Sequence, residues 1–83
     1  MSPPKDRITA IACRMLAKRG VATIPGSGDN LRDAGLTSLD MVNLMLAIED
    51  AFEIEIPQRR MTPANFRTIA AIETLVGAVA LAA

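Results

Sequence analysis

The chain has 83 residues, 51% of them apolar, and its nine basic residues balance nine acidic ones. This length suits one small domain, which we expect to span residues 1–83. A neutral chain without tryptophan or tyrosine argues against nucleic-acid binding, and one cysteine without any histidine argues against an internal disulfide and a zinc site. With only two aromatic residues, the core must be aliphatic, which favours helices over a β-sandwich.

The first predicted helix covers residues 4–19. Its apolar residues follow the i, i+3, i+4, i+7 spacing of one buried face, which comprises Ile8, Ile11, Ala12, Met15 and Leu16. Pro4 suits the first turn, and Gly20 suits the end of the helix. Cys13 lies off this face, so we expect it to be structural or incidental. Charged residues precede the apolar face, so the N-terminus does not resemble a signal peptide.

Residues 20–36 show no helical period, and Gly26, Gly28 and Gly35 interrupt them. A connection of this length is uncommon in so small a domain unless it has a function. We therefore predict a long loop that lies over the bundle. Its apolar anchors would be Val21, Ile24, Leu31 and Leu36.

The second predicted helix, over residues 38–52, has the clearest pattern of the chain. Thr37 is a good N-cap, and the Asp40 side chain can complete a capping box with it. The longer apolar stripe is assigned to the core and consists of Met41, Leu44, Met45, Ile48 and Phe52. A second, shorter stripe consists of Leu39, Val42 and Leu46.

After this helix the sequence predicts an extended connector and a short third helix. Residues 52–57 alternate apolar and acidic, so Ile54 and Ile56 should point inward. Thr62 as N-cap and a following proline then begin the short helix, which ends near Phe66.

Thr68 caps the predicted last helix, whose apolar face comprises Ile69, Ile72, Leu75, Val76 and Val79. Residues 69–83 are too few to span a bilayer, and Glu73 interrupts their apolar run. The four elements predict an all-α fold. It is a small four-helix bundle with a long loop between the first two helices and a short third helix.

These residues do not assemble into a catalytic or metal site. No histidine is available as a general base, and no cysteine–histidine or carboxylate pair stands at a telling spacing. The sequence therefore predicts that the chain is not an enzyme. The informative segment is residues 33–40, DAGLTSLD, which leads into the second helix, with FEIEIP at the far end of that helix.

These two segments, at this spacing, resemble the acyl carrier protein family, and the likeness extends over residues 29–76. Family members carry glycine, an apolar residue, any residue and serine, followed by an apolar and an acidic residue. The resemblance implies a single carrier domain in which Ser38 is the attachment site of 4′-phosphopantetheine, taken from coenzyme A by a phosphopantetheinyl transferase. The reactive thiol then belongs to the cofactor, so the chain needs no catalytic group of its own.

The position of Ser38 agrees with that role. At the first helical position its hydroxyl would be exposed beside unpaired N–H groups and the positive end of the helix dipole, which favour a phosphodiester. By position alone, Ser38 could be an ordinary serine at a helix start. The surrounding motif favours the attachment site.

The net charge of the chain is zero, but the charged residues are unevenly distributed along it. Five basic residues belong to the first helix: Lys5, Arg7, Arg14, Lys18 and Arg19. Every charged residue from 38 to 56 is acidic, and we interpret the second helix as a docking face for basic patches of partner enzymes. The docking residues would be Leu39, Asp40, Val42, Asn43, Leu46, Glu49 and Asp50. The alternative is a merely solvated face.

Four features depart from the family pattern. Thr37 replaces the usual aspartate before the serine, Asn43 stands where glutamate is common, and Glu53 replaces a glycine at the helix end. Residues 58–60, Gln-Arg-Arg, lie where the family tends to be acidic. The chain is therefore less acidic than a housekeeping fatty-acid carrier, which predicts a specialised, secondary-metabolite or lipid-modifying pathway.

We predict a stand-alone, monomeric carrier protein in the cytoplasm, which holds an acyl group as a thioester on the arm of Ser38. Its partners would be a phosphopantetheinyl transferase, an acyl- or aminoacyl-ligase, and downstream transferases or synthases. Two alternatives stay open. One is an aminoacyl or peptidyl carrier loaded by an adenylating amino-acid ligase, and the other is a helical interaction module that never receives the arm.

Overall fold

The computed structural model describes residues 3–82, which form four α-helices and two short 3-10 helices, and no residue of this range is in a strand. In chain order the elements are α1 (Pro4–Lys18), α2 (Leu31–Ala34), α3 (Ser38–Phe52), η1 (Gln58–Arg60), η2 (Pro63–Phe66) and α4 (Ile69–Ala82). The all-α prediction is therefore confirmed. The bounds of the two helices predicted first agree with α1 and α3 to within one residue.

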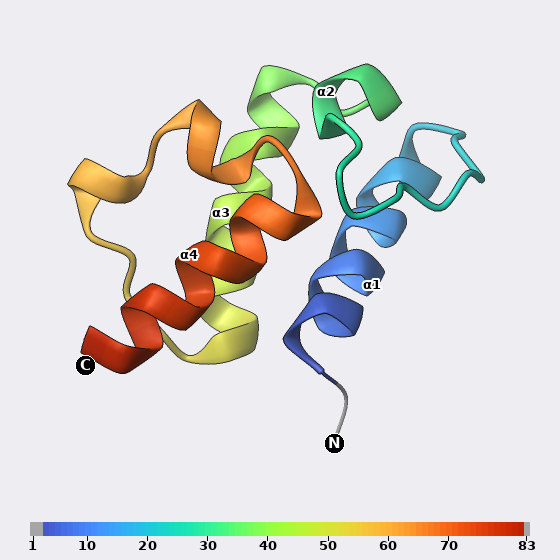
Figure 1. Ribbon diagram of the computed structural model, residues 1–83. Coiled ribbons are helices and arrows are strands. Elements are labelled where there is room, and N and C mark those ends of the chain that lie inside the picture. The colour runs from blue at the N-terminus through green and yellow to red at the C-terminus, as the bar shows by residue number, and fades with distance from the viewer. Residues whose placement is uncertain (1–2, 83) are drawn as a thin grey trace.

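The three long helices enclose one aliphatic core (Figure 1). α1 packs against α3 and α4, while η2 packs against both α3 and α4. All five apolar residues predicted for the last helix are buried. On α1 and α3 the predicted faces also point inward, except that Met15, Met45 and Phe52 are only half-buried at the edge of the core.

The C-terminal ends of α1 and α3 have the same backbone conformation, but glycine adopts it after α1 and glutamate after α3. Just after α1, beyond its C-cap Arg19, Gly20 has a left-handed φ of 79°, and the Val21 N–H donates to the Leu16 carbonyl at 2.9 Å. α3 ends in the same way at Glu53, with φ 52°, and the Ile54 N–H donates to the Glu49 carbonyl at 3.1 Å. Left-handed backbone favours glycine, so α3 ends in a strained conformation that α1 avoids.

The segment between α1 and α3 is more ordered than predicted. It contains the short helix α2, which begins after Asn30 and ends at Gly35. The Asn30 side chain accepts hydrogen bonds from the N–H groups of residues 32 and 33, and Gly35 has φ 134°. The anchor role predicted for Ile24 is wrong, since this side chain is 71% exposed, and the neighbouring Pro25 is buried in its place.

In the connector after α3 the predicted apolar residues point inward, but the short helices differ from the prediction. Ile56 is buried and Ile54 is partly buried against the core. The predicted third helix exists as the 3-10 helix η2. Thr62 stands at its N-cap and Pro63 at its first position, as predicted, but the Thr62 side chain makes no capping hydrogen bond. The cap predicted at Thr68 is confirmed, because its Oγ1 accepts from the Ala71 N–H at 3.0 Å.

Candidate functional site

Ser38 is the first residue of α3, and its side chain is exposed. The residues before it explain this placement. Gly35 takes a left-handed backbone against the side chains of Val21 and Leu16, and Leu36, which is 2% exposed, enters the core. The buried leucine fixes the chain two residues ahead of the serine, so that the hydroxyl is presented at the surface.

A complete capping box holds the start of α3. The Thr37 Oγ1 accepts from the Asp40 N–H at 3.1 Å, and the Asp40 carboxylate accepts from the Thr37 N–H at 3.0 Å. The box predicted from the sequence is therefore confirmed. The capping box satisfies the backbone N–H groups of Thr37 and Asp40. It does not use the backbone N–H of Ser38, which can therefore bind an anion.

An ion pair connects the end of α1 to the same box. The Arg19 guanidinium donates from Nε to Asp40 Oδ2 at 2.8 Å and from Nη2 to Asp40 Oδ1 at 2.9 Å. Its Nη2 also lies 3.4 Å from the Thr37 Oγ1. The hydrogen bond from Arg19, followed by that from the Thr37 backbone, holds the pKa of Asp40 well below its usual range. The same hydrogen bond raises the pKa of Arg19.

Two of the predicted docking residues, Asp40 and Glu49, make hydrogen bonds within the chain. Asp40 is only 8% exposed, and its carboxylate is engaged by Arg19 and Thr37. The Glu49 carboxylate accepts from the Ile56 N–H at 2.8 Å and so stabilises the turn after α3. Both carboxylates were predicted to face a partner because they lie on the acidic helix, but the structure uses them within the chain.

The other predicted docking residues form one exposed surface of α3. Leu39, Val42 and Leu46 are 67%, 50% and 57% exposed, and we call these three side chains the outer apolar stripe. Asn43 and Asp50 are also exposed. Ser38 stands at the N-terminal end of this surface, so the helix places the attachment candidate and the stripe side by side.

A groove of about 460 Å³ opens beside Ser38. Its apolar wall consists of Met41, Val42, Met45, Met61 and Pro63. Its polar rim consists of Ser38, Asn30, Arg32 and Arg67. The sequence did not single out these arginines, because they are distant from the serine along the chain and no local pattern links them to it.

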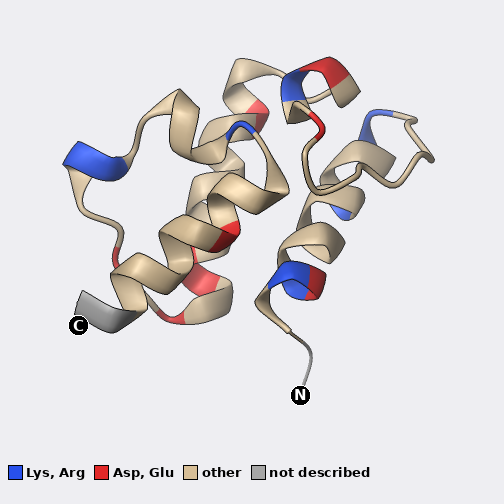
Figure 2. Ribbon diagram, in the orientation of Figure 1, with Lys and Arg blue, Asp and Glu red and all other residues tan. Residues whose placement is uncertain are grey.

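The charges are segregated as the sequence predicted. Figure 2 shows basic residues along α1 and at η1, and acidic residues at the C-terminal end of α3. Arg7 of α1 lies over the Phe52 ring, 4.3 Å from its centre, and donates a hydrogen bond to the Ala51 carbonyl. The basic helix is thus joined to the acidic helix at both of its ends, by Arg7 and by Arg19.

Other kinds of site are not found in the described part of the chain. Residues 3–82 contain no cluster of three or more histidine, cysteine or acidic side chains that could hold a metal ion. None of the described helices has the length and apolarity needed to cross a membrane. Cys13 is half-buried and has a free thiol.

A family model described as "Phosphopantetheine attachment site" matches residues 6–76. Aminoacyl carrier protein 1 of Bradyrhizobium diazoefficiens is 39% identical over 72 residues, which are 87% of this chain and 80% of that protein. The aminoacyl carrier protein of Agrobacterium fabrum is 45% identical over 67 residues, covering 75% of this chain and 80% of that protein.

Two solved structures are similar in fold. One is a chain of the Bradyrhizobium japonicum glycine:[carrier protein] ligase complexed with glycylated carrier protein, with a TM-score of 0.80 and 34% identity. It is matched over 89% of this chain and 99% of that chain. The other contains the same ligase with its cognate carrier protein and an analogue of glycyl adenylate, with a TM-score of 0.83, 34% identity, and coverage of 93% and 99%.

Proposed function

We propose that this chain, which belongs to the phosphopantetheine-attachment family of acyl and aminoacyl carrier proteins, carries an amino acid as a thioester on an arm attached to Ser38. The observation that carries the proposal is the position of this serine. It is exposed at the first residue of a capped helix, beside an apolar surface, within the span that the family model matches. The likeness to the aminoacyl carrier proteins of Bradyrhizobium diazoefficiens and Agrobacterium fabrum supports the amino acid as cargo.

The residues around Ser38 fit a phosphopantetheine group. The hydroxyl is accessible, and the start of α3 favours the negative charge of a phosphodiester. When bound, the group supplies a terminal thiol on which a thioester can form. The chain itself presents the serine in a fixed position, through Thr37, Asp40 and Arg19.

The chain's own contribution to the chemistry is presentation rather than catalysis. Near Ser38, Arg19 lowers the pKa of Asp40 and so keeps its carboxyl group ionised, and this carboxylate already accepts hydrogen bonds from the Arg19 side chain and the Thr37 N–H. It is therefore poorly suited to act as a general base for the serine. We infer that partner enzymes supply the catalytic groups for attachment and loading.

The docking surface that we propose is the outer apolar stripe together with Asn43 and Asp50. Exposed aliphatic side chains in one stripe are a typical contact for a partner protein. The partners would be a phosphopantetheinyl transferase, an amino-acid ligase and downstream transferases. In the relatives, a glycine ligase occurs in complex with a carrier protein.

The cargo is tested by loading the purified holo-protein with an amino-acid:[carrier protein] ligase, ATP and a panel of amino acids. We expect one small amino acid to add as a thioester, detected by intact mass and released by hydroxylamine. The Ser38→Ala variant is the matched control and should remain unloaded. If no amino acid is transferred while the same ligase loads its own carrier, the aminoacyl assignment is contradicted.

One observation favours an acyl group as a second candidate cargo. The groove beside Ser38 is lined by three methionines, Met41, Met45 and Met61, and methionine adapts readily to apolar ligands. An acyl chain could lie there. An acyl-ligase in place of the amino-acid ligase in the loading experiment distinguishes the two cargoes.

A further inference from the structure

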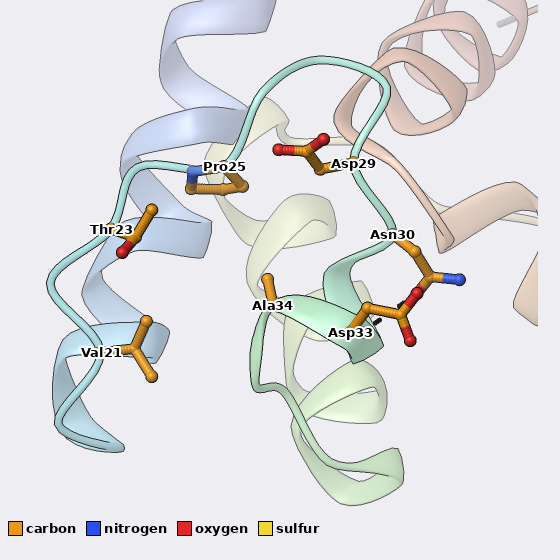
Figure 3. A pocket seen from close by; sticks show the side chains of 7 residues that line it. All are labelled: Val21, Thr23, Pro25, Asp29, Asn30, Asp33 and Ala34. Carbon is orange, nitrogen blue, oxygen red and sulfur yellow. Dashed lines mark hydrogen bonds between the residues drawn. The ribbon is translucent and has the colours of Figure 1, made fainter.

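The helix α2 separates two hollows of opposite charge. The hollow on its loop side, of about 420 Å³, is shown in Figure 3. The charged side chains that line it, Asp29 and Asp33, are acidic. The groove on the other side of α2 includes Ser38, and the charged side chains that line it, Arg32 and Arg67, are basic. Asn30 borders both hollows, so the change of sign occurs across one short helix.

The backbone brings the two arginines to the same rim. The Leu31 N–H donates to the Arg67 carbonyl at 2.8 Å, which ties the turn before α4 to the first residue of α2. Arg32 is the next residue, and both arginines are exposed. Among residues 3–82 the only ion pair is the one between Arg19 and Asp40. The guanidinium groups of Arg32 and Arg67 therefore have no described carboxylate within ion-pair distance.

We propose that Arg32 and Arg67 bind the phosphodiester that would join the arm to Ser38. The chain itself would then bind this end of the phosphopantetheine group, which we call the root of the arm. This inference rests on the proposed function. Guanidinium groups bind phosphate oxygens through paired, charge-assisted hydrogen bonds, and the N-terminus of α3 adds potential of the same sign. Asp40, the buried acid nearest in sequence, does not oppose the anion because Arg19 already neutralises it.

The consequence is a preferred direction for the arm. A phosphodiester held at the rim by Arg32 and Arg67 directs the chain that follows it along the wall of Met41, Met45 and Met61. The arm then rests on the carrier until a partner displaces it. In this role the two arginines are binding residues for the root of the arm, not for the cargo.

The direct test compares the side-chain Nε–Hε resonances of the arginines in apo- and holo-protein by NMR. Intact mass first shows that the sample is fully holo, so that failure of attachment is separated from failure of this inference. We expect the signals of Arg32 and Arg67 to shift on attachment, while those of Arg59 and Arg60 stay in place. Unchanged Arg32 and Arg67 signals in a fully holo sample would overturn the proposal.

A second measurement uses variants of equal charge change. At low ionic strength the holo-protein should have a higher thermal midpoint than the apo-protein, and most of this difference should disappear at about 1 M NaCl, where the Debye length is ~3 Å. The double variant Arg32→Gln/Arg67→Gln should abolish the difference. The control Arg59→Gln/Arg60→Gln should keep it. If the control removes it equally, only the general charge of the chain matters and the proposal fails.

The source of the anion is tested on the apo-protein with inorganic phosphate as the probe. The proposal expects no shift of the Arg32 and Arg67 signals at millimolar phosphate, because the covalent link to Ser38 supplies the high local concentration. Shifts with free phosphate but none on attachment of the arm would identify a free-anion site and contradict the proposal.

Discussion

The two faces of α3 carry apolar residues of the same kind in opposite environments. On the inner face Leu44 and Ile48 are fully buried against the core. On the outer face the stripe of Leu39, Val42 and Leu46 is at least half exposed in every residue. The difference arises because α1 and η2 pack against the core side of α3 and, within the described chain, no other helix covers its outer side.

This contrast separates residues that stabilise the fold from residues that are available to contact a partner. Burial of a leucine side chain stabilises the fold by about 1.5–3 kcal/mol, a gain that the outer stripe does not contribute. Exposed aliphatic side chains in a row are instead a typical contact for a partner. Ser38 lies at the end of this outer stripe, whereas Asp40, two residues later, is turned inward.

The largest expected effect comes from truncating a leucine on each face. Leu44→Ala should lower the free energy of unfolding by about 2–5 kcal/mol, because it leaves a cavity in the core. Leu46→Ala is the matched control, two residues away, and should change it by no more than ~0.5 kcal/mol. Urea unfolding measures both values. Equal losses would show that the two faces do not differ as described.

The second-largest effect on stability is expected at Asp40, which is buried at the start of α3 and holds the helix start that presents Ser38. Because Arg19, and then the Thr37 backbone, lower its pKa in the folded chain, the unfolded chain binds the proton more readily. This contribution to stability is therefore complete above about pH 4, the unfolded pKa, and is lost as the pH falls further. Asp40→Asn should lower the thermal midpoint at pH 7 by roughly 5 °C and weaken its dependence on pH below 4. Parallel pH curves for the variant and the wild type would contradict this role.

The outer stripe should matter for recognition even though it adds little to stability. Leu46→Ala is expected to raise the KM of the loading ligase about five- to tenfold with little change in kcat, because only partner contact is lost. Steady-state loading of the holo-protein measures both constants. Ala47→Gly, on the same helix but half-buried, serves as a control for helix weakening. An unchanged KM for Leu46→Ala would remove this residue from the docking surface.

The smallest effect is expected at the far end of α3. Glu53 has a left-handed backbone, which costs a residue with a side chain more than glycine. Glu53→Gly should therefore raise the free energy of unfolding by about 0.5–1 kcal/mol, whereas Gly20→Ala at the corresponding end of α1 should lower it by a similar amount. Chemical unfolding of the two variants checks the opposite signs.

Local patterns were sufficient to predict the parts of the fold that local residues determine. The start of α3 at Ser38 follows from the capping box of Thr37 and Asp40, and the helix period predicts its buried face. The short helices α2 and η1 were missed because three or four residues cannot show a period. The 3-10 geometry of η2 could not be foreseen from its proline start.

Within the candidate site, the sequence predicted Ser38 and the exposed stripe. It did not predict the ion pair that positions the start of α3 or the arginines that line the groove. Arg19 and Asp40 are far apart along the chain and meet only because α1 packs against α3. The sequence therefore assigned Asp40 to docking, and the pairing that buries it needed the tertiary structure. The same holds for Arg32 and Arg67, which reach the groove only through the contact between α2 and the turn before α4.

The most direct test of the account is the intact mass of the chain after co-expression with a broad-specificity phosphopantetheinyl transferase, beside the Ser38→Ala variant. We predict one added phosphopantetheine on the wild type, none on the variant, and the same thermal midpoint for the two apo-proteins. An unmodified wild type, in cells where the same transferase modifies another carrier, would contradict the attachment site and favour a helical interaction module that works without the arm.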